Sequence, residues 1–309
     1  MDWAHLLDLL AATIRIATPL AFAAMGGILS ERAGVFAVGL EGMMLSGACG
    51  AAVGAVLLGP AAGILGAALC GGAMGAVIAT VTVRHGADNM VTGIAANILA
   101  IGLTNFLVRV LLGHGASPRI HIDLLGPVRI PLLADLPGLG PLLFDQPWLT
   151  YMAALVPLPL TLFLSRSRWG LTLRAAGENP LAVFAVGGDP LAIRFRAVVA
   201  CGAVAGIGGA VLVLGQVGTF TDNMTAGRGY LALAAIIVGR WTPWPTIAAC
   251  LLFAAADALT LRVQVFSLPV SSYVVQMLPY ALALAVLVGL GHSARLPAAA
   301  GTTFRRGGG

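Results

Sequence analysis

The stretch Ser30–Gly47, SERAGVFAVGLEGMMLSG, places a carboxylate at the front of a long apolar run. Glu41 lies between two glycines, Gly39 and Gly42, and small or apolar residues follow it. A carboxylate that faces lipid costs roughly 2.5–3.5 kcal/mol on insertion scales, and glycines allow backbone geometries that a regular helix does not use. This combination is typical of a broken helix at a functional site of a membrane protein.

The composition is that of an integral membrane protein. The 309 residues are 59% hydrophobic and 9% charged, whereas a soluble domain carries about 25% charged residues. All 17 basic residues are arginines, and they form no basic stripe interleaved with aromatics. The composition therefore predicts contact with a lipid membrane and does not favour nucleic-acid binding.

Nine apolar segments approach the length of about 20 residues that a spanning helix requires. The expected fold is all-α, a polytopic transmembrane helix bundle with nine spans, or eight or ten. The seventh segment is too short to span alone, so it is expected to be broken or to extend into its neighbours. The segments are Leu6–Leu29, Val35–Leu58, Ala61–Val83, Asn89–Leu112, Trp148–Leu164, Phe195–Val217, Tyr230–Gly239, Pro245–Leu261 and Ser271–Leu290.

The arginines orient this bundle, because positively charged loops stay in the cytoplasm. The loop 165–196 carries five arginines against two acids, and the C-terminal tail carries three arginines, so both are expected inside. The loop 113–147 carries two arginines against three acids and is expected outside. The prediction is a transmembrane domain over residues 1–291, an outer N-terminus, and a disordered cytoplasmic tail over residues 292–309.

The common patterns of enzymes and metal sites are absent from the sequence. There is no P-loop, which requires a lysine, and no HExxH motif. Ser46 and Ser117 have no histidine in a later span with which to form a protease site. The four cysteines lie in apolar stretches away from histidines and are expected to pack as small hydrophobes. We expect no enzyme activity, no metal and no bound cofactor in this chain.

Few polar residues lie within the predicted spans, and these are the candidates for a solute path. A structural role is the alternative for each. The asparagines can hydrogen-bond between helices, and Asp257 can pair with Arg262. Glu41 can cap or brace a helix start, paired with Arg32 or Arg15. The candidates for the path are Gly39, Glu41, Gly42, Asn97, Asn105 and Asp257.

A second glycine-rich element, Gly227–Trp241, has the sequence GRGYLALAAIIVGRW. In the predicted topology it runs inward, whereas Val35–Leu58 runs outward. Two short or broken segments in opposite orientations are what an inverted repeat produces around a central site. The match between the two sequences is poor, so the repeat rests on orientation alone.

The inner loop contains the signature of a short helix. Asn179 is suited to cap it and Pro180 to occupy its first turn, and Asp189-Pro190 restarts a helix toward the sixth span. A charged loop with a short helix on the cytoplasmic face is well suited to dock another protein. A simple connector is the alternative, although 32 residues is long for that role.

Together, three stretches resemble the inner-membrane permease subunits of ATP-binding-cassette (ABC) importers, in the branched-chain amino acid, ribose and nucleoside permease superfamily. They are Ser30–Ala48, Arg174–Pro190 and Gly227–Trp241. The first has the form typical of the nucleoside, simple-sugar-like branch, and the resemblance covers roughly residues 18–289. Ala37 and Val38 depart from the asparagine and isoleucine usual in that branch, and Leu181 stands where a charged residue is common.

The resemblance implies a multi-pass permease in the bacterial inner membrane for a nucleoside or simple-sugar-like solute. A periplasmic or lipoprotein receptor would deliver the solute, and a second permease, favoured as non-identical, would complete the path. A separate cytoplasmic subunit would bind ATP and drive transport. The coupling residues would be Gly177, Glu178, Asn179, Pro180 and Ala182.

The alternative function is a secondary transporter of a small polar solute, driven by protons or sodium. Glu41 and Asp257 would then carry the coupling ion. Only these two acids are candidates within the spans, and the chain has a long loop of the docking type. Both features argue against this alternative.

Overall fold

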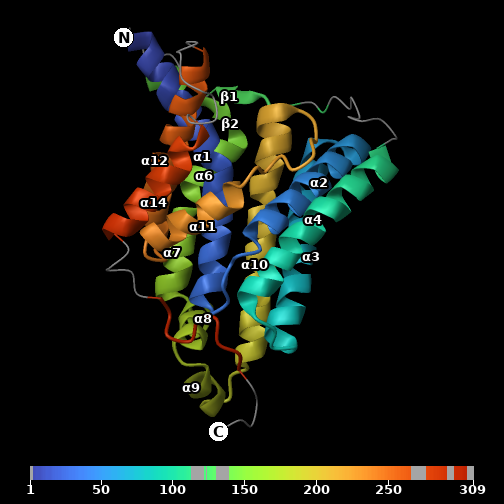
Figure 1. The fold of residues 1–309 in the computed structure, drawn as a ribbon, viewed down its shortest axis with the longest axis vertical. Helices are drawn as coiled ribbons and strands as arrows, with labels where there is room; N and C mark the ends of the chain where they lie inside the picture. Colours follow the sequence, from blue (N-terminus) through green and yellow to red (C-terminus); the bar gives the residue numbers. More distant parts are fainter. Residues whose placement is uncertain are drawn as a thin grey trace.

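A computed structural model describes residues 3–112, 122, 124–129, 139–265, 276–290 and 296–304. These residues form a helix bundle with one two-stranded ribbon at one end (Figure 1), which confirms the predicted fold class. Within these described residues, seven helices are long and apolar enough to cross a membrane, and two shorter apolar helices, Arg228–Val238 and Leu278–Gly289, accompany them. Most of the predicted outer loop 113–147 lies outside the described residues, as does the start of the ninth predicted span, 271–275.

The first half of the chain contributes four long helices and the ribbon. Their bounds are α1 (Trp3–Arg32), α2 (Leu40–Leu58), α3 (Pro60–Ala79) with its π-helical continuation η1 (Thr80–Arg84), α4 (Asn89–Leu112), β1 (Pro127–Arg129), α5 (Leu139–Leu143) and β2 (Asp145–Pro147). The strands β1 and β2 pair antiparallel, with Val128 opposite Gln146.

The second half contains shorter helices around one long one. Their bounds are α6 (Trp148–Leu155), α7 (Pro157–Arg166), α8 (Arg168–Glu178), α9 (Pro180–Ala185), α10 (Pro190–Ala210) with its π-helical continuation η2 (Val211–Val217), α11 (Arg228–Val238), α12 (Pro243–Val265) and α14 (Leu278–Leu290). The predicted fifth span is thus two helices, α6 and α7, with Pro157 at the start of the second. Proline suits the first turn of a helix because the amide hydrogen it lacks has no helical partner there.

Close helix packing forms the centre of the bundle, where α2, α3 and α10 meet. A Cβ atom at Gly71 would lie 2.3 Å from the carbonyl oxygen of Gly202, and one at Gly206 would lie 2.3 Å from that of Ala67. Only glycine allows the backbones to approach this closely. The glycines therefore create a dense scaffold against which the broken segments are held.

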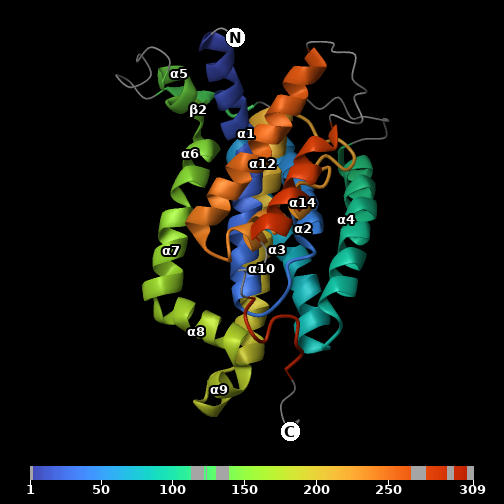
Figure 2. The same cartoon turned by 60° about the vertical axis from the view of Figure 1, so that its left-hand side comes forward.

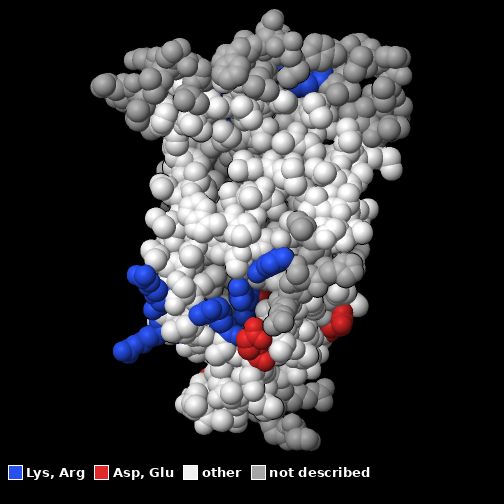
Figure 3. Space-filling model, turned by 90° about the vertical axis from the view of Figure 1, so that its left-hand side faces the viewer, with Lys and Arg blue, Asp and Glu red and all other residues white. Residues whose placement is uncertain are grey.

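The two ends of the bundle differ in their elements. Helices α8 and α9 project at the end opposite the β1–β2 ribbon (Figures 1 and 2), and we call this the α9 end. On the face seen in Figure 3, charged side chains gather toward the α9 end, and a broad uncharged surface lies above them. An uncharged belt of this kind is what the hydrocarbon core of a bilayer requires, and it identifies a multi-pass membrane protein.

The C-terminal tail is a correction to the sequence analysis. Residues 296–304 are not disordered but pack against the α9 end of the bundle. Ala299 is buried, and its amide donates a hydrogen bond to the carbonyl oxygen of Gly177 at 2.9 Å. The amide of Gly301 donates to the carbonyl oxygen of Gly34 at 3.0 Å. The buried Arg194 donates to the carbonyl oxygens of Ala33, Ala176, Ala299 and Thr302. A buried cation needs several such acceptors, and here they join the tail to three other segments.

Candidate functional site

Glu41 connects the first turn of α2 to the first turn of α11. Its side chain is 4% exposed. Oε1 accepts a hydrogen bond from the amide of Gly227 at 2.8 Å, and Oε2 accepts one from the amide of Gly229 at 2.6 Å. These amides belong to the start of a helix, where N–H groups lack helical partners and a negative charge is favoured. The carboxylate therefore caps a helix that begins 187 residues later in the chain.

The glycines around this contact are required by geometry. Gly227 has φ +83°, and a Cβ atom at Gly229 would lie 2.5 Å from the amide nitrogen of Glu41. From this joint α2 and α11 run in opposite directions (Figure 1), the arrangement that the predicted inverted repeat requires. The repeat itself stays a prediction.

Asn97 of α4 holds the same joint from a third helix. Its Oδ1 accepts from the amide of Gly42 at 2.8 Å, and its Nδ2 donates to the carbonyl oxygen of Val38 at 3.0 Å and to the hydroxyl of Tyr230 at 2.8 Å. The amide group thus satisfies backbone groups that the break before α2 leaves open. This is the interhelical bonding that was the structural alternative for Asn97.

Glu31, the other acid of the stretch Ser30–Gly47, contacts the segment that follows the C-terminal end of α11. The indole Nε1 of Trp241 donates to Oε2 of Glu31, and the amide of Ala37 donates to Oε1 at 3.3 Å. Arg32 donates through Nε to the carbonyl oxygen of Trp241 at 3.0 Å. Glu31 and Glu41, ten residues apart, therefore hold the two ends of α11. The predicted pairing of Glu41 with Arg32 or Arg15 is wrong, because Arg15 instead donates to Gln146.

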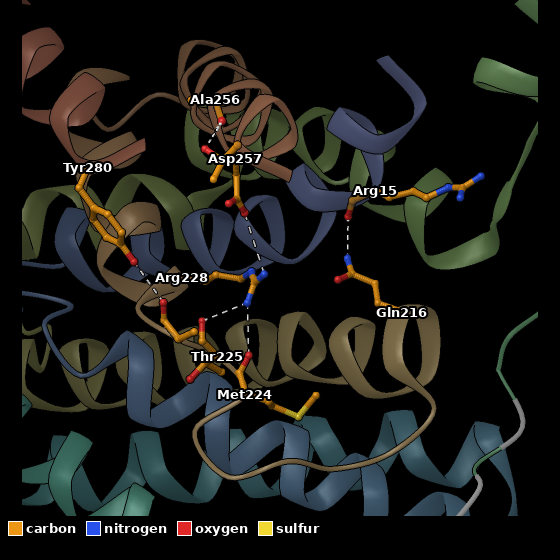
Figure 4. A network of polar contacts seen from close by, with 10 residues as sticks. Arg15, Gln216, Met224, Thr225, Arg228, Ala256, Asp257 and Tyr280 are labelled. Carbon is orange, nitrogen blue, oxygen red and sulfur yellow. Dashed lines mark hydrogen bonds and ion pairs between the residues drawn. The ribbon is translucent and has the colours of Figure 1, made fainter. Parts of the chain in front are cut away.

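The third acid, Asp257, lies opposite Arg228 (Figure 4). Its Oδ2 is 4.0 Å from Nη2 of Arg228, and both side chains are partly exposed. The predicted alternative, a pair with Arg262, is wrong, because Arg262 pairs with Asp8 at 3.5 Å. Nε of Arg228 is buried without a hydrogen-bond partner in the described part of the chain. Tyr280 donates to the carbonyl oxygen of Ala226 at 3.1 Å beside this pair.

The loop that was predicted to dock another protein folds as expected. Asn179 Oδ1 accepts from the amide of Ala182 at 3.0 Å, and Pro180 begins α9. Asp189 caps α10 through the amides of Leu191 and Ala192. The sequence therefore predicted both helix starts correctly.

The residues of this loop differ in what they contact. Gly177 is buried, and a Cβ atom there would lie 2.2 Å from the carbonyl oxygen of Arg32, so it is a packing position. Glu178 is exposed and accepts from the amide of Ala298 in the tail at 3.1 Å. The apolar side chains of Leu181 and Val186 are 63% and 85% exposed on the projecting α9 segment.

Comparison with known families agrees with this architecture. Residues 9–290 match the family described as branched-chain amino acid transport system / permease component. The chain belongs to this permease family. The interruption before α2, the braced α11 and the projecting α9 are therefore features of a permease rather than of a membrane enzyme.

Individual members of this family are similar to the chain over most of its length. The permease is 32% identical to the guanosine ABC transporter permease NupQ of Bacillus subtilis over 318 residues, which cover 99% of each chain. It is 34% identical to the nucleoside ABC transporter permease NupC of Lactococcus lactis over 316 residues, which cover 98% of this chain and 99% of the relative. It is also 34% identical to the putative glucose ABC transporter permease TsgC13 of Haloferax volcanii over 84% of this chain and 79% of the relative.

Two further polar positions of the permease lie toward the ribbon end. Asn105, two turns beyond Asn97 on α4, has a buried Oδ1 with no hydrogen-bond partner among the described residues. In α1, Pro19 cannot donate to the carbonyl oxygen of Arg15, and Nε2 of Gln216 donates to it instead at 2.8 Å (Figure 4). A side chain from η2 thus satisfies the carbonyl oxygen that Pro19 leaves without a helical partner.

Sequence reasoning missed four residues of the permease site: Glu31, Tyr230, Trp241 and Arg228. Glu31 carried a signal, because it is a second acid in the same stretch as Glu41. The aromatic residues carried little, since a tyrosine or tryptophan beside an apolar run is also typical of a membrane interface. Their partners lie about 130 to 210 residues away in the chain, and local patterns do not show contacts of that range.

Proposed function

We propose that this permease forms part of the translocation path for a nucleoside in an ABC importer. The observation that carries the proposal is the match over nearly the whole chain to permeases named for guanosine and for nucleosides. The relative named for glucose is matched over a smaller share of both chains. A nucleoside is thus the favoured solute, and a simple sugar is the second candidate.

The path is proposed to run along the exposed surface beside the start of α11. In Figure 1, α11 lies between α14 and α2, and α4 lies beyond α2. Tyr230 and Tyr280 are each 44% exposed there and are hydrogen-bonded through their hydroxyls. Their rings suit stacking on a nucleobase, which contributes roughly 1–3 kcal/mol per base in nucleic-acid complexes.

The predicted path residues divide into two groups in this proposal. Gly39, Glu41, Gly42 and Asn97 shape the path without lining it, because Glu41 and Asn97 are buried and occupied by backbone partners. Asp257 and Asn105 are the polar groups left for the solute. Asp257 is partly exposed beside Arg228, and Asn105 has an acceptor without a partner in the described residues.

ATP hydrolysis is proposed to occur on a separate cytoplasmic chain that contacts α9. The sequence has no lysine and therefore no P-loop, so no ATP site and no cofactor is proposed for this chain. The exposed Leu181 and Val186 offer apolar contacts, and Glu178 and Asn179 offer polar ones. Pro180 and Ala182 belong to the capped first turn that holds this projection rigid.

The remaining partners follow from this role. A second permease subunit, favoured as non-identical, would cover the exposed path surface, and a periplasmic or lipoprotein receptor would deliver the solute. The arginine-rich α9 end is proposed to face the cytoplasm of a bacterial cell and the ribbon end the outside. This orientation places the C-terminus inside.

The secondary transporter is the weaker proposal on the described contacts. A residue that carries a proton must be free to gain and lose it during transport. The carboxylate of Glu41 is buried and accepts hydrogen bonds from two backbone amides, so it is engaged in holding α11. Asp257 lies 4.0 Å from the guanidinium of Arg228, so a carried cation would have to compete with a fixed positive charge.

Uptake in cells tests the choice of solute. The gene for this chain is expressed together with genes for an ATPase and a receptor of the same organism, in a bacterial strain that lacks nucleoside uptake. We expect uptake of radiolabelled guanosine that an excess of unlabelled nucleoside inhibits and an excess of glucose does not. If glucose inhibited this uptake and unlabelled nucleoside did not, the proposed solute would be a sugar instead of a nucleoside.

A further inference from the structure

An apolar groove that shares no lining residue with the proposed path opens on the bundle. It lies between α7, α8 and α10, with Leu29 of α1 at its base, and has a volume of about 450 Å³. This volume is within the range of ligand pockets, roughly 300–1,000 Å³. Its walls are apolar, with Leu160, Phe163 and Ala197 among them.

The length of the groove along α7 is within the thickness of one membrane leaflet. Along α7 the lining extends from Val156 to Phe163, which is about 10 Å at a rise of 1.5 Å per residue. Arg166 then ends the helix. A single leaflet of the hydrocarbon core is about 15 Å thick. In the proposed orientation the groove lies in the leaflet next to the α9 end, at the level of the acyl chains.

The mouth of the groove is basic. A second hollow of about 630 Å³ continues from it and shares Trp169 and Arg196 with it. Arg168 lines this second hollow, and neither its guanidinium nor that of Arg196 has an ion-pair or hydrogen-bond partner among the described residues. The one acid there, Asp189, accepts from two amides at the start of α10. The mouth therefore holds two guanidinium groups against one carboxylate and carries a net positive charge.

Trp169 places this mouth at the surface of the membrane. Its side chain is 67% exposed at the junction of the apolar groove and the basic hollow. Tryptophan is enriched at the level of lipid head groups, because its ring is apolar with a polar edge. An acyl chain would fill the apolar groove on one side of this ring, and a phosphate would occupy the basic hollow on the side toward the α9 end.

We propose that this groove binds one anionic phospholipid of the inner leaflet, with an acyl chain along α7 and the phosphate against Arg168 and Arg196. Basic pockets on the cytoplasmic side of membrane helices suit anionic head groups. The lipid would link α7 and α8 to α10, the helices that flank the α9 projection. This site does not depend on which solute the permease transports.

Native mass spectrometry of the full-length chain in mild detergent tests the proposal. The chain is titrated with phosphatidylglycerol and with phosphatidylcholine of the same acyl chains. We expect tighter binding of phosphatidylglycerol, and a loss of about 5-fold in its affinity for either Arg168→Gln or Arg196→Gln. Arg166→Gln is the matched control, because Arg166 is exposed, lies on α7 and does not line either hollow. It should leave the affinity unchanged.

Two results of this titration would overturn the proposed site. One is equal affinity for the two lipids, and the other is an equal loss for Arg166→Gln, which would indicate attraction by net charge alone. A second measurement uses phosphatidylglycerol with brominated acyl chains, which should quench fluorescence that Trp169→Phe removes. Displacement by glycerol phosphate, which has no acyl chains, would indicate a free-phosphate site and would contradict the proposal. Loss of the lipid when the ATPase subunit binds would identify the groove as a partner surface and would also contradict it.

Discussion

The carboxylate of Glu41 lies 2.6 Å from the amide nitrogen of Gly229, 188 residues away in the chain. This contact joins the first turns of α2 and α11, and Glu31 holds the other end of α11 through Trp241. Hydrogen bonds to a charged group contribute about 1.5–3 kcal/mol each when buried. The position of α11 in the bundle therefore depends on two acids of one short stretch.

The first prediction concerns Glu41→Gln. The oxygen of the glutamine side chain can still accept from the backbone N–H of Gly227 or of Gly229. Its NH₂ group then faces the other backbone N–H, and both are donors. We expect a loss of about 2 kcal/mol in stability and a large loss of solute uptake. Thermal unfolding in detergent and uptake by cells measure the two effects. Asp222→Asn is the control, because its pair with Arg109 is exposed on both sides and is worth under about 1 kcal/mol. Equal melting temperatures for the wild type and Glu41→Gln would contradict the brace.

A second prediction concerns the close approach at Gly229. Gly229→Ala places a methyl group 2.5 Å from the amide nitrogen of Glu41, so α11 must move away from α2. We expect lower thermal stability and loss of uptake. Gly102→Ala on α4 is the matched control, since no atom lies within 4 Å of its added Cβ. If both variants transport normally, the backbone contact is not needed.

A third prediction concerns the tail and Arg194. Removing the guanidinium in Arg194→Gln leaves carbonyl oxygens of the tail and of the segment after α1 without donors. We expect a loss of about 2–4 kcal/mol and faster proteolysis of the C-terminal segment. Arg166→Gln removes the same charge from an exposed position and should change neither property. Unchanged proteolysis in Arg194→Gln would show that the tail is held by other contacts.

The fourth prediction concerns the α9 projection. Leu181→Ser and Val186→Ser change side chains that are exposed in the isolated chain, so the fold should be retained. We expect weaker co-purification of the ATPase subunit. Leu296→Ser, exposed on the tail at the same end of the bundle, should not affect it. Charge reversal in Glu178→Arg should lower uptake relative to ATP hydrolysis. Full co-purification and uptake in all these variants would exclude α9 as the docking element.

Much of the fold could be predicted from the sequence, because the signals were local. Apolar runs of sufficient length marked the helices, and Asn179-Pro180 and Asp189-Pro190 marked helix starts that the structure confirms. The short α11 was also recognised as too short to span alone. Such features depend on neighbouring residues, which a sequence shows directly.

The contacts of the site could be predicted only in part. Glu41 was recognised as a candidate from its glycines, but its partners were assigned to arginines, whereas the structure gives it two amides. Asp257 was paired with Arg262, five residues away, although a guanidinium from α11 lies opposite it. The tail was read as disordered from its composition, yet its backbone is held by Arg194. In each case the partner is distant in the chain and is often a backbone group without a residue-type signal.

The energy source of transport is the central claim of this account, and transport into proteoliposomes tests it most directly. The chain is reconstituted with its ATPase and receptor, and labelled guanosine uptake is measured with ATP and without it, at equal pH or across a proton gradient. We predict uptake that requires ATP and is unchanged when the proton and sodium gradients are collapsed. Uptake driven by an ion gradient in the absence of ATP would contradict the account and would make Glu41 or Asp257 an ion carrier.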